Sequence, residues 1–312
     1  MFGFINNRKQ QNEEIFVVII MAYLGDALVG NSLFQNIKRI YPNSKTVFII
    51  NKPYYEIAKY QKDVDEVVVY DKNGEHKGFI GLFKFVKNFP YKKIKYVFKM
   101  CQKSRVDAIS LLLKPQKIIN YKHDISLSPQ DRFNNLLRKV TKEEVIELPI
   151  VYNATDDIPM SLQNLLVKDK KYIALCPISS NEIKDMPLST SIDLINKLVL
   201  ANYEVLLVGV GERTEKYASE LEENNCKFIN LVNKTSIYEL AQTLRNCKAL
   251  ISVDTGTMHI GYASGVPTVC LFYVENNIKG WAPDQVLYPH TIVPTDKNPQ
   301  NIFDACMQIV GK

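Results

Sequence analysis

The residues most suited to chemistry form a small polar turn at the end of an apolar run. Ala249–Val253 predicts a buried strand, and a helix begins near Gly256. The free N–H groups and positive dipole end of such a helix bind anions. His259 lies in its first turn, where the ring can reach the same anion, and Asp254 can accept hydrogen bonds from hydroxyls. An ordinary helix cap, with Asp254 or Thr255 as the capping residue and an exposed His259, explains the spacing equally well.

A second turn of this kind follows the apolar run Tyr172–Cys176. It carries the hydroxyls of Ser179 and Ser180, and Lys184 comes four residues beyond Ser180. Two hydroxyls and a lysine suit a phosphate group, although a single loop lysine is usually just solvated.

Two carboxylates also stand at predicted strand ends. The turn Gly209–Glu212 lacks the third glycine of a dinucleotide fingerprint, but it leaves Glu212 where it can meet a ribose diol. Asp26 follows the strand predicted at Ile15–Met21, either as a functional group or as a helix cap. Asp63-Val64-Asp65 matches a metal-binding pattern but lies at the start of a strand, so we expect no metal site.

Short apolar runs alternate with helix-period segments along the whole chain, which predicts parallel strands joined by crossover helices. The predicted strands are Ile15–Met21, Thr46–Ile50, Glu66–Tyr70, Tyr96–Phe98, Lys117–Tyr121, Tyr172–Cys176, Tyr203–Val208, Phe228–Leu231, Ala249–Val253 and Thr268–Phe272. The predicted helices are Ala27–Tyr41, Val106–Leu113, Ser191–Leu200, Arg213–Glu223, Ser236–Arg245 and Asn301–Val310. The array occurs twice and is interrupted by the polar stretch Tyr152–Pro159. We therefore expect two doubly wound domains, residues 1–152 and 153–312, facing a cleft.

Composition limits the function classes further. The 312 residues are 46% hydrophobic and 23% charged, as in a soluble globular protein. The longest apolar run, Ile15–Leu24, is too short to cross a bilayer. Six scattered cysteines have no metal or disulfide spacing, so we expect reduced thiols in a cytoplasmic protein.

The net charge of +6 is too small for a dedicated nucleic-acid binder, and it is unevenly divided. Up to Tyr152 the chain has 25 basic and 15 acidic residues, and beyond it 14 and 18, so the halves carry +10 and −4. The interval Lys84–Arg105 is rich in lysine and has no acidic residue. It forms either a solvated face or a surface for an anionic glycolipid or the inner membrane leaflet.

Several stretches resemble glycosyltransferase family 9, which contains the ADP-heptose:lipopolysaccharide heptosyltransferases. They run in the family's order through nearly the whole chain, and the Asp-Thr-Gly-x-x-His block at Asp254–His259 is fairly specific. The stretches are Leu24–Asp26 with Tyr41-Pro42, Asn233–Ile237 with Glu239-Leu240, Ser252–Ile260, Ala263–Thr268 and Leu271-Phe272.

The resemblance implies the GT-B fold, in which two Rossmann-like domains bind the acceptor (N-terminal) and the nucleotide sugar (C-terminal). A last helix, about residues 299–310, would cross back to the first domain. The implied reaction is inverting, needs no metal or other cofactor, and uses an N-terminal aspartate as general base. The matching position is Asp26. The positions that match the donor-site motifs are Ser179, Ser180 and Lys184 for the phosphates, Glu212 for the ribose, and Asp254, Thr255, Gly256 and His259 for the diphosphate and sugar.

The chain departs from the family in two stretches. Met186 stands where the family usually has tryptophan before Pro187, and Tyr273–Asn277 replaces the usual Gly-Pro-Thr-Asp-Pro. Transfer of a heptose from ADP-heptose to a lipopolysaccharide core or similar glycan, at the cytoplasmic membrane face, is the expected function. A nucleotide-sugar-binding protein without transfer activity is the main alternative, and a GT-B sugar epimerase is a weaker one.

Overall fold

The computed structural model describes residues 13–21, 24–122, 124, 127–168 and 170–311. They form two compact units. The first contains the residues up to Asp124 and Gln130–Leu148, and the second contains the short stretch before Gln130 and the chain from Pro149 onward. The assignment of acceptor binding to the N-terminal domain and donor binding to the C-terminal domain stays a prediction.

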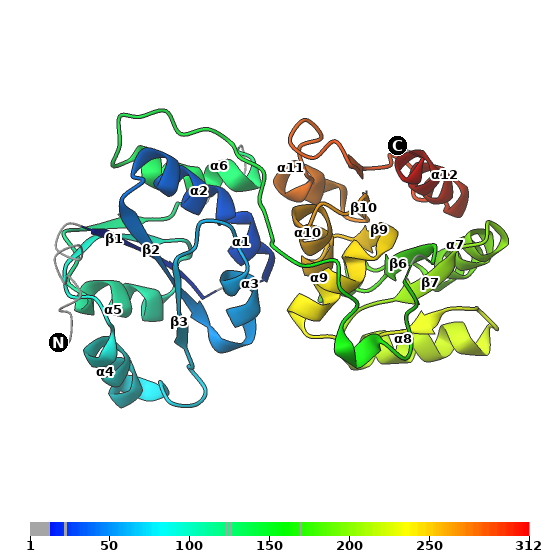
Figure 1. Cartoon of the computed structure of the whole chain (residues 1–312), viewed down its shortest axis with the longest axis horizontal. Helices are drawn as coiled ribbons and strands as arrows, with labels where there is room; N and C mark the ends of the chain where they lie inside the picture. The colour runs from blue at the N-terminus through cyan, green and yellow to red at the C-terminus, as the bar shows by residue number, and fades with distance from the viewer. Residues whose placement is uncertain (1–12, 22–23, 123, 125–126, 169, 312) are drawn as a thin grey trace, which may run out of the picture. The chain divides into compact units, whose positions relative to one another are not determined.

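The first unit is built on a five-stranded parallel sheet (Figure 1). Its strands are β1 (Glu14–Ile20), β2 (Ser44–Asn51), β3 (Glu66–Tyr70), β4 (Ile94–Lys99) and β5 (Lys117–Asn120), in the order β3-β2-β1-β4-β5. All five predicted strands are confirmed. The strand order reverses at β1: β2 and β3 are added on one side of it, and β4 and β5 on the other. Ligands of such sheets bind beyond the carboxyl ends of the strands near this reversal.

Helices cover both faces of this sheet, with α2 and α6 on one face and α4 and α5 on the other (Figure 1). The helices are α1 (Leu24–Val29), α2 (Asn31–Ile40), α3 (Tyr55–Lys59), α4 (Gly78–Asn88), α5 (Ser104–Leu112) and α6 (Pro129–Arg138), with a 3-10 turn at Lys52–Tyr54. The single helix predicted at Ala27–Tyr41 is two helices that part at Gly30. The side chain of Met100, directly beyond β4, packs against Gly30, where a Cβ atom would lie 1.9 Å from its terminal methyl carbon.

The second unit is built on a six-stranded parallel sheet in the order β11-β10-β9-β6-β7-β8. Its strands are β6 (Tyr172–Cys176), β7 (Glu204–Leu207), β8 (Ile229–Asn230), β9 (Cys247–Val253), β10 (Thr268–Leu271) and β11 (Thr291–Ile292). The five predicted strands are confirmed, and β11 was not predicted because two residues carry no periodic signal.

The helices of the second unit follow the sequence pattern closely. They are α7 (Leu188–Leu200), α8 (Glu212–Glu223), α9 (Ile237–Arg245), α10 (Gly256–Ala263), α11 (Ile278–Trp281) and α12 (Pro299–Val310), with 3-10 turns at Met160–Leu162, Glu182–Lys184 and Glu275–Asn277. Helix α12 packs against α7, β9 and β10 and buries Ile302, Cys306 and Ile309 in the core of the second unit. Its predicted crossing to the first unit stays a prediction.

Two further expectations concern the whole chain. All six cysteines are free thiols, and five of them are buried. Among the described residues, no helix has the length and apolar character needed to cross a membrane.

Candidate active site

A polar cluster occupies the carboxyl edge of the sheet in the second unit. The carboxylate of Asp254, directly beyond β9, is 5% exposed. Its Oδ2 atom lies 2.7 Å from Nζ of Lys184 and accepts a hydrogen bond of 2.8 Å from Nδ2 of Asn277. Charge and hydrogen bonding therefore offset the burial of this carboxylate. The cluster brings together two predicted residues and Asn277, which was not predicted.

His259 is buried beside this cluster rather than exposed on the first helical turn. Its ring is 3% exposed, lies 5.8 Å from the ring of Trp281, and its Nδ1 atom is 2.6 Å from the hydroxyl of Tyr262. Burial lowers the pKa of His259 to about 4, the Asp254 carboxylate partly offsets this, and the Lys184 ammonium lowers it further. The ring is therefore neutral at pH 7.

The start of α10 matches the anion-binding turn better than the ordinary cap. Thr255 is the N-cap residue, but its side chain makes no capping hydrogen bond, and Asp254 is engaged by Lys184 and Asn277. Gly256 begins the helix next to this cluster. Gly261 keeps the helix close to the sheet, because a Cβ atom there would lie 2.4 Å from Cδ2 of Leu250. The helix N-terminus thus adds N–H groups to the cluster.

The turn after β6 holds itself in shape through its own polar groups. The N–H of Ser179 donates to Oδ1 of Asp185 at 2.7 Å, and its hydroxyl donates to the carbonyl of Asn181 at 2.8 Å. Arg213 donates to the carbonyl of Ser179 at 3.0 Å and pairs with Asp185. Ser179 is buried in this network, whereas Ser180 is exposed. The turn precedes Lys184, so it places that lysine against Asp254.

Glu212 lies in the first turn of α8, exposed at the carboxyl end of β7. The turn before it needs glycine, since Gly209 and Gly211 have φ angles of +150° and +93°. The N–H of Gly211 donates to Oδ1 of Asn233 at 2.8 Å, which holds the turn open toward solvent. Within the described part of the chain, no hydrogen bond or ion pair joins Glu212 to Lys184, Asp254 or Asn277, so Glu212 is not part of the Asp254 cluster.

In the first unit, Asp26 lies in the first turn of α1, beyond the carboxyl end of β1. It is half-buried. Burial raises the pKa of the Cys101 thiol and of the Tyr121 hydroxyl, and the nearby Asp26 carboxylate adds to both shifts. Asp26 thus faces the same edge of the sheet as the ends of β4 and β5.

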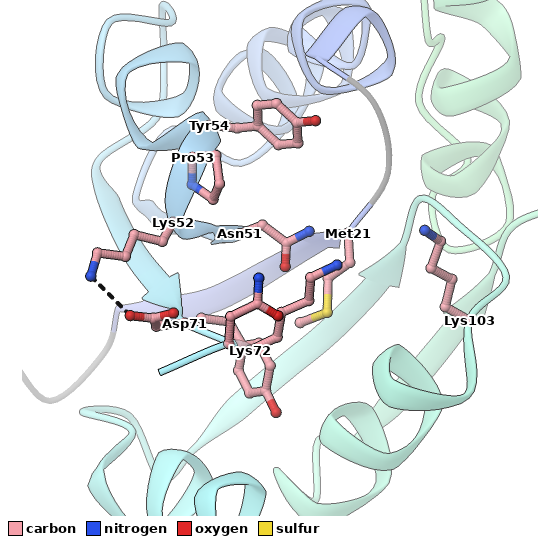
Figure 2. A pocket seen from close by; sticks show the side chains of 10 residues that line it. Met21, Asn51, Lys52, Pro53, Tyr54, Asp71, Lys72 and Lys103 are labelled. Carbon is pink, nitrogen blue, oxygen red and sulfur yellow. Dashed lines mark hydrogen bonds and ion pairs between the residues drawn. The ribbon is translucent and has the colours of Figure 1, made fainter. Parts of the chain in front are cut away.

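A cavity of about 280 Å³ opens at this edge (Figure 2). Asn51 points into it, with its Oδ1 atom buried and without a hydrogen-bond partner among the described residues. Lys52 pairs with Asp71 at 2.9 Å, and Lys72 and Lys103 are exposed on the cavity rim. The cavity is therefore polar and carries excess positive charge. The complete lining is Met21, Asn51, Lys52, Pro53, Tyr54, Tyr70, Asp71, Lys72, Asn73 and Lys103.

A second cavity of about 260 Å³ lies near the end of β5 and is also basic. Lys122, Arg132, Arg138 and Lys139 line it, with Asp124 as its acidic member. Apart from Lys103, the charged residues of the two cavities were not singled out from the sequence. Two residues of the first cavity could have been found from the sequence. Asn51 is the last residue of β2 and Asp71 directly follows β3, so both lie at the carboxyl ends of strands.

The chain is similar to known proteins in sequence and in fold. Residues 79–287, more than half of the chain, match the family model described as Glycosyltransferase family 9 (heptosyltransferase). The chain is 25% identical over 267 residues to lipooligosaccharide heptosyltransferase 2 of Campylobacter jejuni serotype O:6, covering 80% of this chain and 78% of that protein.

Two solved structures show the fold. The family 9 glycosyltransferase of Veillonella parvula superimposes with a TM-score of 0.79 at 18% identity, covering 95% of this chain and 97% of that one. The E. coli ADP-heptose lps heptosyltransferase II gives a TM-score of 0.73 at 15% identity, covering 95% and 98%. The predicted GT-B architecture of two Rossmann-like domains is confirmed.

Proposed function

The chain belongs to glycosyltransferase family 9, and from that premise we propose that it moves a heptose from ADP-heptose to an anionic bacterial glycolipid or glycan, such as a lipopolysaccharide core. Membership of the family makes the protein a glycosyltransferase. The donor, the acceptor, the inversion of the anomeric carbon and the independence from metals are the parts that we propose.

The polar cluster of the second unit is the proposed donor site. A diphosphate leaving group needs stabilisation of its growing negative charge, which the N-terminus of α10 and the ammonium of Lys184 supply. Neutral His259 has one ring N–H, and it donates this hydrogen bond to a phosphate oxygen while Nδ1 accepts from the hydroxyl of Tyr262. Thr255 and Gly256 contribute the first N–H groups of the helix.

The rest of the nucleotide extends over the neighbouring turns in this proposal. Exposed Ser180 binds phosphate from the turn after β6, and buried Ser179, whose N–H and hydroxyl donate within that turn, holds it in shape. Exposed Glu212 accepts hydrogen bonds from the ribose hydroxyls. The Asp254 carboxylate orients Lys184 and accepts a hydrogen bond from a sugar hydroxyl. In the loop Tyr273–Asn277, which departs from the family, the amide of Asn277 donates a hydrogen bond to the same carboxylate.

Asp26 is the proposed general base. Its carboxylate takes the proton of the acceptor hydroxyl while that oxygen attacks the anomeric carbon, and the bond to the diphosphate breaks on the opposite face. The transferred sugar therefore inverts its configuration, and ADP leaves. Asp26 stands at the basic carboxyl edge of the first unit, where Lys72 and Lys103 can hold an anionic acceptor.

The location of such an acceptor suggests where the enzyme acts. The first half of the chain carries the whole positive excess of +10. A basic surface is attracted to the anionic cytoplasmic leaflet by about 1 kcal/mol per lysine or arginine near the surface. We therefore propose a cytoplasmic enzyme that contacts the inner membrane peripherally and binds no nucleic acid.

The Asp26→Asn variant tests the mechanism. General-base catalysis contributes about 10²- to 10⁴-fold, so transfer from ADP-heptose should fall by that factor. Binding of ADP-heptose, measured by calorimetry, should stay within about twofold because Asp26 lies in the other unit. Wild-type turnover in this variant would remove Asp26 from the mechanism. Donor binding by the wild type with no product from any glycan acceptor would instead favour a binding protein without transfer activity.

A further inference from the structure

Helix α4 exposes large apolar side chains to solvent. Phe79 is 82% exposed, Ile80 87% and Phe83 59%, whereas Leu82 and Phe85 of the same helix are buried against the first unit. Exposed apolar residues are ordinary when they are scattered singly, but three on one short helix form a patch. Such a patch marks a surface that something else covers.

Helical spacing places these residues together with two lysines. Phe83 follows Phe79 by four residues and Ile80 by three, Lys84 follows Ile80 by four, and Lys87 follows Phe83 by four. All five therefore share the outer side of α4, which we call the α4 face. Figure 1 places α4 at the edge of the first unit, beside α5.

The surroundings of the α4 face are strongly basic. From Lys77 to Lys95 the chain has six lysines and no acidic residue. Glu75 lies next to this interval and pairs with Lys84 at 2.9 Å, and Lys95 pairs with Glu14. Lys77, Lys87, Lys92 and Lys93 are exposed, and no ion pair to them is found in the described part of the chain.

We propose that the α4 face docks on an anionic lipid surface, with Phe79, Ile80 and Phe83 inserted among the acyl chains. The lysines of the same helix would contact lipid phosphates while their stems pack on apolar surface. Neither element suffices alone for stable attachment, but a short apolar insertion and a basic patch act together. A second copy of the chain is a poorer occupant, because a symmetric contact through this face would place the two sets of lysines against each other.

This inference rests on the proposed function to the extent that a glycolipid acceptor resides in a membrane. It goes further by naming the element that touches the bilayer. The interval Lys84–Arg105 was recognised from its charge alone, whereas the apolar part of the α4 face, Phe79, Ile80 and Phe83, lies outside that interval.

Flotation of the full-length protein with vesicles tests the proposal. Phosphatidylcholine vesicles with roughly 30% phosphatidylglycerol, which gives them a negative surface potential, should retain the wild type at low salt, and pure phosphatidylcholine should retain much less. The F79A/I80A/F83A variant should lose about 100-fold in affinity, because it removes three inserted side chains. K84Q/K87Q should lose about fivefold per lysine, and less at high salt.

Controls separate docking from folding and from catalysis. L200A/V286A removes side chains that are 84% and 88% exposed in the second unit, and it should bind vesicles like the wild type. Because Ile80 is exposed, I80E should keep the wild-type unfolding temperature yet lose vesicle binding, which serves if the triple variant folds poorly. Transfer to a delipidated, water-soluble acceptor should be the same for the wild type and I80E.

Three results would overturn the proposal. The wild type fails to float with anionic vesicles, or the triple variant floats as the wild type does, or the α4 variants convert a dimer into a monomer in sedimentation. Absence of transfer in the wild type with every acceptor would contradict the proposed function instead, and the vesicle result would stand by itself.

Discussion

The two units place polar side chains at the same edge of their sheets but leave them in different states. In the second unit the buried carboxylate of Asp254 already has an ammonium and an amide as partners. In the first unit the buried Oδ1 atom of Asn51 has no partner among the described residues, and Lys72 and Lys103 are exposed around the same cavity. The polar groups of the Asp254 cluster have protein partners, whereas the cavity of the first unit is presented with a carbonyl oxygen and two lysines.

This difference fits the two tasks proposed for the units. A donor site must hold a diphosphate and stabilise one charge distribution, so fixed groups with their own partners suit it. An acceptor site must admit and release a large glycan, and unsatisfied groups give a ligand hydrogen bonds that the empty protein lacks.

The titration of His259 should have the largest effect. The pKa of this buried ring is about 4 in the folded protein and about 6.5 in the unfolded chain. The unfolded chain therefore binds the proton more tightly, so this contribution to stability is complete above pH 6.5 and is lost as the pH falls toward 4. It amounts to about 3 kcal/mol.

Urea unfolding of the wild type and His259→Asn between pH 4 and pH 7 measures this contribution. Asparagine keeps a hydrogen-bonding group near Tyr262 but does not titrate, so the free energy of unfolding should depend less on pH in the variant. Other carboxylates titrate in both proteins, and their effect cancels in the difference. Parallel curves for the two proteins would mean that the ring is accessible to water, contrary to its 3% exposure.

Removal of the buried charge in the second unit should have the next largest effect. Asp254→Asn leaves an amide that Asn277 can still reach but takes the negative partner from Lys184. Since Lys184 is 23% exposed and can turn toward water, we expect a loss of about 2 kcal/mol, below that of a completely buried pair. Affinity for ADP-heptose should also fall, because Lys184 loses the group that orients it.

Asp71→Asn is the matched control in the first unit. It removes the partner of Lys52, a lysine that is 68% exposed, and the Asp71 carboxylate has a pKa lowered mainly by that lysine. An exposed pair contributes little, so the urea midpoint should hardly move. Equal losses in the two variants would remove the contrast between a buried cluster and an open cavity.

Much of the fold could be predicted from the sequence, for a physical reason. Parallel strands that are buried on both faces appear as short apolar runs, so β6, in which every residue is buried, was located to the residue. The edge strand β3 is only half-buried, and its run of three valines located it equally well. Helix α4 was not predicted; Phe79, Ile80 and Phe83 add apolar residues to its outer side and weaken its contrast with the inner side. The weakened contrast between its two sides is the same property that led to the docking proposal.

The candidate site was predictable only in part. Lys184, Asp254 and His259 follow strand ends or begin a helix, so their neighbourhood could be foreseen. The burial of His259 and its contact with Trp281 depend on how a distant loop folds back, and no local pattern reports that. Asn277 was likewise hidden in the loop that departs from the family. That the Oδ1 atom of Asn51 has no hydrogen-bond partner among the described residues depends on tertiary packing, which the sequence pattern does not report.

A small change in stability is also expected from Asn51→Ala. Because the buried Oδ1 atom has no partner among the described residues, removing it gives up no hydrogen bond of that atom, and the free energy of unfolding should change by less than about 1 kcal/mol. Asn36 is the matched control in the same unit, since its Nδ2 atom donates to the carbonyls of Ser32 and Ile146 at 2.9 and 2.8 Å. Asn36→Ala leaves buried groups without partners and should cost about 2 kcal/mol.

In transfer assays the order is reversed: Asn51→Ala should have the larger effect on activity and Asn36→Ala the smaller one. If the acceptor supplies the hydrogen bond that Asn51 lacks, Asn51→Ala should raise the KM for the acceptor about fivefold, which corresponds to one hydrogen bond of about 1 kcal/mol. The KM for ADP-heptose should not change, because the donor cluster lies in the other unit. A large loss of stability in Asn51→Ala with an unchanged acceptor KM would show that this side chain supports the fold. The polar groups at the two sheet edges would then both serve stability, and the contrast between them would be lost.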